Sequence, residues 1–173
     1  KNKRATEVAM MAALKDAGFT VKFKADKLTR NAVDAVIGEN VGLIRSIPQR
    51  YLSDVGVAVF QNTMGGGDLA TLADQLQEKY GIAHRRAALI ARDQNHKAKA
   101  AIERAQRLEA GITRSRWKHS HAGKDPRPSH VAMDGKLYDI EKGMWDKDEE
   151  AYIWPGVLIN CRCSDETQIP GFN

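Results

Sequence analysis

The side chains that could bind a metal or take part in catalysis gather towards the C-terminal end of this chain. Cys161 and Cys163 are the only two cysteines, and a single residue separates them. A stretch upstream, residues 119–130, holds three histidines and Asp125. Thiolates, imidazoles and carboxylates are the ligands of Zn²⁺, and a structural zinc site needs four of them. The spacing predicts a structural zinc site with Cys161, Cys163, His130 and His121 as ligands, and with Asp125 and His119 as alternatives.

The same residues also allow a site without metal. Two cysteines one residue apart would form a strained disulfide, because neighbours in an extended chain point to opposite faces. Reduced thiols, and therefore a reducing compartment, are expected. In the metal-free alternative the thiols are small buried groups beside strands and the histidines cap loops. Since strand neighbours face apart, the metal hypothesis requires a bend at Arg162.

The positive charge of the chain is concentrated in one segment. Of 27 Lys and Arg and 22 Asp and Glu, residues 84–127 contain twelve basic and four acidic ones. Such a segment is expected to face nucleic acid or an anionic protein. The alternative is a long solvated helix, because Trp117 is the only aromatic residue there that could stack on a base. The candidate binding residues are Arg85, Arg86, Arg92, Lys97, Lys99, Arg104 and Arg107.

Apolar residues recur at steps of three and four through the first two-thirds of the chain, which predicts helices. The expected helices cover 4–17, 26–47, 49–64, the segment between Asp68 and Gly81, and 83–110, with a short strand or extended arm at 19–24. Pro48 is expected to end the second helix and start the third. The glycines at 65–67 predict a flexible break before the fourth.

After Gly111 the pattern changes to short extended segments. Strands are expected at 112–118 and 157–163, with extended pieces around Val131 and Leu137 joined by a turn at 134–135, and a loop at 141–152. The predicted fold class is α+β, with a helical body at 1–111 that ends in a long basic helix and a small β-rich unit at 112–173. A unit of about sixty residues usually gains stability from a metal or a partner.

Several short motifs of the chain occur together in one known family. They are Arg92-Asp93-Gln94, Gly111-Ile112, Trp117, Ser120, Asp125-x-Arg127-x-x-His130, Met133-Asp134-Gly135-Lys136 and Pro155-Gly156-x-x-Ile159-Asn160-Cys161-Arg162-Cys163. Their order and spacing, over about residues 41–163, resemble the phage Mu F-like family of minor head, or capsid morphogenesis, proteins. The resemblance implies a virion protein made in the cytoplasm of the infected bacterium. It also implies association with the portal or head interior, a part in head assembly and DNA entry or exit, and no established catalysis.

The motif residues also have a structural interpretation that needs no metal. Asp125 and Arg127 are expected to bond backbone groups that short strands leave unpaired. Arg162 is expected to pair with an aspartate, and Trp117 is expected to cover the small core. The aspartates considered for Arg162 are Asp125, Asp134 and Asp165. The resulting structural motif comprises Trp117, Asp125, Arg127, His130 and Arg162.

Two other functions are compatible with parts of the sequence. A metal-dependent hydrolase or nuclease would use His119, His121, Asp125 and His130 to activate water at an open coordination position. Two thiolates on one ion are more typical of a structural site, however. A DNA-binding regulator lacks a helix-turn-helix partner for the basic helix. No apolar run approaches the ~20 residues that span a bilayer, so a membrane partner is not expected.

Overall fold

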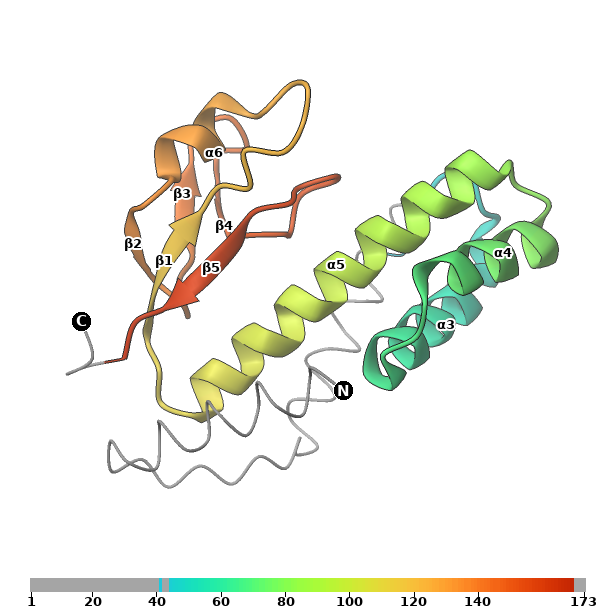
Figure 1. Ribbon diagram of the computed structural model, residues 1–173, viewed down its shortest axis with the longest axis horizontal. Coiled ribbons are helices and arrows are strands. Elements are labelled where there is room, and N and C mark those ends of the chain that lie inside the picture. The colour runs from blue at the N-terminus through green and yellow to red at the C-terminus, as the bar shows by residue number, and fades with distance from the viewer. Residues whose placement is uncertain (1–40, 42–43, 170–173) are drawn as a thin grey trace.

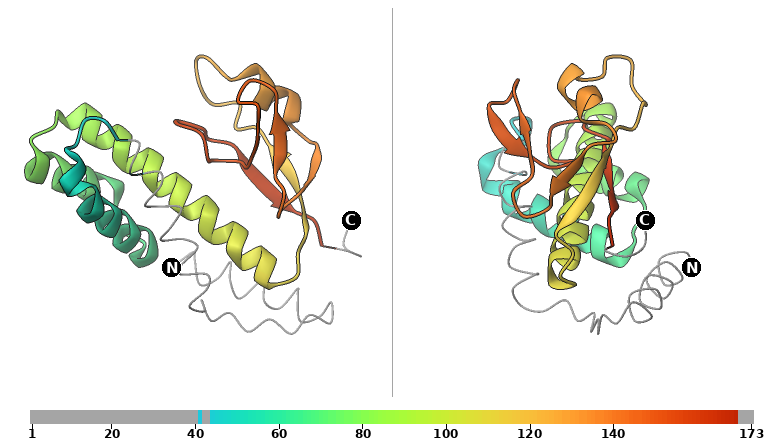
Figure 2. Two further views of the ribbon diagram at one scale, coloured as in Figure 1. Left: turned by 180° about the vertical axis from the view of Figure 1, so that it is seen from behind. Right: turned by 90° about the vertical axis from the view of Figure 1, so that its left-hand side faces the viewer.

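The computed structural model describes residue 41 and residues 44–169 of the 173-residue chain. Three helices, α3 (Leu52–Gly65), α4 (Leu69–Tyr80) and α5 (His84–Glu109), precede a small β unit (Figure 1). The long helix α5 runs between the α3–α4 pair and the β unit (Figures 1 and 2). This order confirms the α+β fold class. The helix predicted at 4–17, the arm at 19–24 and most of the helix at 26–47 lie outside the described residues.

Capping residues set the limits of the helices. Asp68 accepts a hydrogen bond from the Thr71 N–H at 3.1 Å, which satisfies a free donor in the first turn of α4. Gly66 and Gly81 end α3 and α4 in the left-handed conformation, with φ of 65° and 64°. The predicted break at 65–67 and the boundaries of α4 are confirmed. The predicted helix at 49–64 begins as a 3₁₀ turn, Gln49–Tyr51, before α3.

The three helices enclose an apolar core. α3 and α4 contribute Val55, Val59, Leu72 and Leu76, and α5 contributes mainly small side chains, Ala87, Ala91 and Ala98, with Ile90. Burying one such Leu or Val stabilises the fold by roughly 1.5–3 kcal/mol. Val41, Ile44 and Ile47 are buried in the same core. Ile44–Ile47 forms turns rather than the end of the predicted helix, because Pro48 disfavours the helical conformation before it.

The β unit contains two small antiparallel sheets and one short helix. The central strand β1 (Arg114–Lys118) pairs with β2 (Leu137–Asp139) on one side and β5 (Ser164–Thr167) on the other. Strands β3 (Met144–Asp146) and β4 (Ala151–Ile153) form a separate hairpin, and α6 (Pro128–Met133) follows β1. Trp117, which has no exposed surface, lies at the centre of the core of this unit.

Three predictions for this unit are wrong. Val131 lies in α6, which Pro128 starts because a fixed φ suits the first helical position. The predicted loop at 141–152 holds the β3–β4 hairpin. The predicted strand at 157–163 is a loop, and the strand begins at Ser164. The left-handed backbone of Gly156 (φ 82°) and Asn160 (φ 57°) breaks the extended conformation, and this bending allows both cysteines to face the same way.

The end of α5 is held against the three-stranded sheet by a partly buried group of charged and polar side chains. Arg107 binds both carboxylate oxygens of Asp165, at 2.7 and 2.8 Å. The hydroxyl of Tyr138 donates to the same carboxylate at 2.8 Å. Burial, followed by the negative charge of Asp165, raises the pKa of Tyr138, so this hydroxyl remains a donor. One guanidinium nitrogen, Nη1, donates to both oxygens, and this charge-assisted contact holds the end of the helix close to the sheet.

Candidate metal centre

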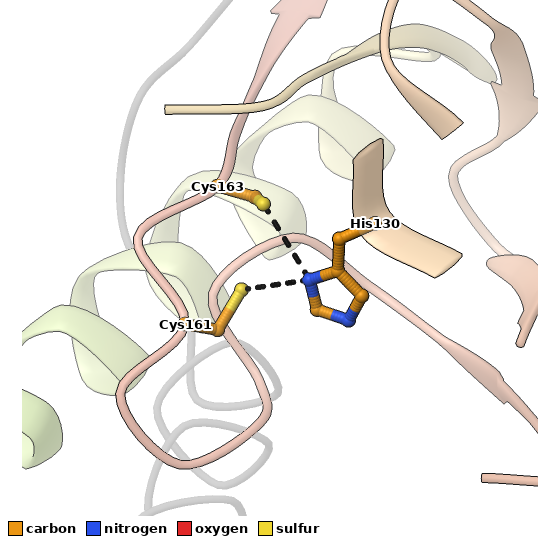
Figure 3. A group of neighbouring side chains, drawn as sticks. All are labelled: His130, Cys161 and Cys163. Carbon is orange, nitrogen blue, oxygen red and sulfur yellow. Dashed lines mark hydrogen bonds between the residues drawn. The ribbon is translucent and has the colours of Figure 1, made fainter. Parts of the chain in front are cut away.

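Three of the predicted ligands meet in the core of the β unit. His130 lies on α6, and Cys161 and Cys163 lie on the loop before β5. Both Sγ atoms are 3.5 Å from Nδ1 of His130, and Figure 3 shows the two cysteines pointing at this one ring nitrogen. The ligand atoms all lie within 4.8 Å of one another. The three residues are 2–5% exposed, so the donors face each other in a place with little water.

The second ring nitrogen of His130 faces a buried carboxylate. Nε2 is 3.5 Å from Oδ2 of Asp146, a residue with no exposed surface. This ring nitrogen of His130 has no hydrogen-bond partner. Asp146 accepts bonds from the Ser129 hydroxyl (3.0 Å) and from the N–H groups of Asp148 (2.8 Å) and Glu149 (3.4 Å). Burial acts to raise the pKa of Asp146, but these three bonds outweigh it and hold the pKa below its usual value. A carboxylate behind a ligand histidine is a common feature of metal sites.

The two thiols influence each other and are surrounded by N–H donors. The hydrogen bond from Cys163 lowers the pKa of Cys161 against the effect of burial, and the His130 ring and the Gly156 N–H act in the same direction. The same bond, followed by burial, raises the pKa of Cys163, although the Ser120 N–H favours its thiolate. The thiol of Cys161 therefore loses its proton more easily, whereas the thiol of Cys163 keeps its own. A cation is needed to make both sulfurs thiolates together.

The other predicted ligands are divided between two places. His119 and Asp125 line a pocket of about 310 Å³ that also borders His130, Cys161 and Cys163. His121 is not part of this group, because its Nε2 lies 2.9 Å from Oδ2 of Asp134 and most of its side chain is exposed. The structure thus brings together three of the four first-choice ligands and places both alternatives beside them.

The arginines of the predicted motif have different surroundings. Arg127 donates to the Ile159 carbonyl at 3.0 Å, and this oxygen belongs to a loop without a strand partner. Arg162 is exposed and forms no ion pair with any described residue. Its expected partners Asp165 and Asp134 are taken, the first by Arg107 and the second by His121. Asp125 is exposed and lines the pocket that borders His130, Cys161 and Cys163.

Three of the seven basic residues that are candidates for binding nucleic acid or a partner are buried or partly buried. Lys97 is 4% exposed and pairs with Asp93 at 3.0 Å, and the partly buried Arg107 pairs with Asp165 at 2.7 Å. Arg104 lies over the Trp154 ring at 4.2 Å, and burial lowers its pKa. These three side chains already have partners within the protein, and the binding role of all seven residues stays a prediction. Of the other four candidates, Lys99 pairs with Glu103 and Arg86 bonds Ser46, whereas Arg85 and Arg92 are exposed without a described partner.

The motif Arg92-Asp93-Gln94 connects α5 to the cysteine loop. Oδ1 of Asp93 accepts a bond from the Asn160 N–H at 2.7 Å, while Oδ2 pairs with Lys97. One turn further along α5, Nε2 of His96 lies 3.3 Å from the Cys163 carbonyl. The loop is therefore attached to α5 on both sides of Cys161. Sequence reasoning missed the roles of Asp93 and Asp146; the family motif was the available signal for Asp93, and Asp146 had none.

Replacement of Gly156 should loosen this attachment. A Cβ at Gly156 would lie 3.0 Å from His96 Nε2, and its φ of 82° strains any other residue. We expect Gly156→Ala to lower the free energy of unfolding by about 1–3 kcal/mol, measured by urea denaturation. Gly135→Ala is the matched control, because Gly135 has a φ of 75° with no atom within 4 Å. Equal losses for the two variants would mean that the contact with His96 is unimportant.

The order and spacing of the motifs along this chain are those of a protein family that occurs in phages. The chain belongs to the family described as Phage Mu protein F like protein, whose model matches residues 53–165. A curated relative from Haemophilus influenzae strain Rd, named only as an uncharacterized protein, is 36% identical over 138 residues. These cover 80% of this chain and 29% of the relative, so the chain spans less than a third of that protein's length.

Two further findings accompany the family match. No solved structure matches the chain. Among the described residues, no helix has the length and apolar character needed to cross a membrane.

Proposed function

We propose that this protein is a minor head protein that acts in phage head morphogenesis. Membership of the Phage Mu protein F-like family is the observation that carries the proposal. The contacts that join α5 to the β unit support it, because the Arg107–Asp165 ion pair and the Asn160–Asp93 hydrogen bond hold the two parts together as one body. Its partners would be portal or head proteins, its final place would be the virion, and it would be made in the cytoplasm of the bacterial host.

The composition of purified particles tests this role. Heads from the phage or prophage that encodes the chain should contain it, as measured by mass spectrometry of purified particles. Deletion of its gene should lower the yield of DNA-filled heads, counted by electron microscopy, and expression of the intact protein from a plasmid should restore it. Particles that lack the chain, together with an unchanged head yield after deletion, would contradict the proposal.

We also propose that His130, Cys161 and Cys163 hold a structural zinc ion. The donor set fits this ion, since two thiols and one imidazole are borderline-soft ligands gathered within 4.8 Å. The unpartnered His130 Nε2 beside Asp146 fits as well, because a histidine that binds a metal through Nδ1 carries its proton on Nε2. Bound there, zinc would supply a cross-link between α6 and the loop before β5. His119, Asp125 or a water molecule would provide the fourth ligand.

The residues around the cluster prepare it for a cation. The carboxylate of Asp146, 3.5 Å from Nε2, favours the tautomer with the proton on that nitrogen, whose Nδ1 lone pair faces the sulfurs. N–H groups from the loop and from Ser120 support negative charge on the thiols. Trp117 packs edge-on against the His130 ring at 5.3 Å and excludes water from one side. This is the arrangement of a stabilising site in a unit that has little core of its own.

A metal-dependent hydrolase or nuclease is the second candidate function. The pocket beside the three ligands favours it, because His119 and Asp125 line a space where a substrate could approach. A structural zinc site and a hydrolase differ in whether the protein turns over a substrate. We expect the purified, zinc-loaded protein to show no nuclease or peptidase activity above that of a His130→Ala variant. Turnover that is lost in Asp125→Asn while the metal content stays unchanged would favour the enzyme.

A further inference from the structure

Three arginines from distant parts of the sequence converge on the pocket beside the metal centre. Arg92 comes from α5, Arg127 directly precedes α6, and Arg162 stands between the two cysteines. Asp125 is the only acidic residue among the pocket's lining residues. The guanidinium group is the side chain best suited to bind phosphate, because its planar donors match the oxygens of the anion.

None of these three arginines forms an ion pair with an acidic side chain among the described residues. Among the described residues, Arg92 and Arg162 form no ion pair or hydrogen bond through their side chains, and both are exposed. Arg127 uses Nη2 to bind the Ile159 carbonyl, which leaves other donors of its guanidinium available. In contrast, Arg107 pairs with Asp165 and Lys97 pairs with Asp93, and both aspartates are partly buried. Two guanidinium groups without a described partner, and the free donors of a third, therefore meet at one pocket.

We propose that the pocket lined by Arg92, Arg127 and Arg162 binds phosphate groups of a nucleic-acid backbone. The positive charge continues beyond the pocket, because exposed Arg85 lies seven residues before Arg92 on the same face of α5. The two positions are ~10 Å apart along the helix axis. Charges repeated along a surface match a polyanion better than a single carboxylate from a protein side chain. The inference deepens the proposed role in head assembly by placing the contact with packaged DNA at named residues.

Binding of a labelled DNA oligonucleotide of mixed sequence tests this site. We expect the double variant Arg92→Ala/Arg162→Ala to weaken the Kd by at least about tenfold, measured by fluorescence anisotropy at low salt. The slope of log K against log salt should fall by about two, because each of the two arginines would neutralise one phosphate. Arg114→Ala is the matched control, because Arg114 is exposed on β1 away from the pocket, and it should change the Kd less than about threefold.

Several outcomes would overturn the proposal. They are an intact protein that does not bind DNA, an equal loss of affinity in Arg114→Ala, and binding of a polyglutamate peptide that DNA does not displace. The last outcome would assign the pocket to an acidic protein segment. Unchanged thermal stability of the double variant shows that the loss arises at the site, as expected for side chains without described partners. Binding with purified protein is also separate from the particle experiment, so failure of one proposal is distinguishable from failure of the other.

Discussion

Replacing Cys161 with serine should remove the zinc and lower the free energy of unfolding by about 4–5 kcal/mol. The thiol is buried and faces His130 and Cys163, so its loss leaves two donors without a shared cation. Because 1 kcal/mol corresponds to about 2–4 °C for a domain of this size, the Tm should fall by about 10 °C or more. Elemental analysis should give about one zinc per chain for the intact protein and none for the variant.

A chelator supplies the control for this prediction. It should lower the Tm of the intact protein towards that of Cys161→Ser, and it should leave the variant unchanged, because zinc that binds only the native state stabilises that state. His121→Ala is a matched histidine variant, since His121 lies outside the cluster and bonds Asp134, and it should keep the metal. Intact protein that contains no metal and does not respond to the chelator would exclude the zinc site.

Replacing Asp93 with alanine should cost about 3–5 kcal/mol, because it leaves a buried positive charge without a partner. Lys97 is 4% exposed and pairs with Asp93 at 3.0 Å. The same change removes the acceptor for the Asn160 N–H, which attaches the cysteine loop to α5. We therefore expect a lower free energy of unfolding in urea and a weaker zinc affinity, measured by competition with a chelating dye.

Two further variants separate the buried pair from exposed ones. Asp54 and Lys79 form an ion pair of similar length, 2.9 Å, but more than half of each side chain is exposed. Asp54→Ala should change stability little, because water already solvates both charges. The double variant Asp93→Asn/Lys97→Met should recover much of the loss, since it leaves no charge buried. A loss for Asp93→Ala as small as that for Asp54→Ala would show that the docking of the loop does not depend on this pair.

The helical part of the fold could be predicted because its signals are local. Asp68 and Gly81 mark the ends of α4 through their own backbone and side-chain preferences. The buried stripe of α3 and α4 follows from the spacing of Val55, Val59 and Leu72. The family could also be recognised from the sequence, because its motifs keep their order and spacing from Arg92 to Cys163.

The β unit was harder to predict, because its segments are short and depend on each other. Strands β3 and β4 have three residues each and exist only as a pair, so neither shows a clear alternation by itself. The segment 157–163 has the apolar residues of a strand, yet its backbone N–H groups bond elsewhere, for example that of Asn160 to Asp93. Tertiary contacts overrode local preference at this point.

By itself, the sequence determined which side chains could hold a metal and which family the chain belongs to. Tertiary structure decided which of those side chains meet: His130, Cys161 and Cys163 converge, while His121 turns to Asp134. It also decided which charges remain available, because the β unit covers Lys97 and Arg107 but leaves Arg92 exposed. The physical reason is that ligation and burial depend on distances between segments far apart in the chain. Helix caps and apolar spacing depend only on residues within a few positions of each other.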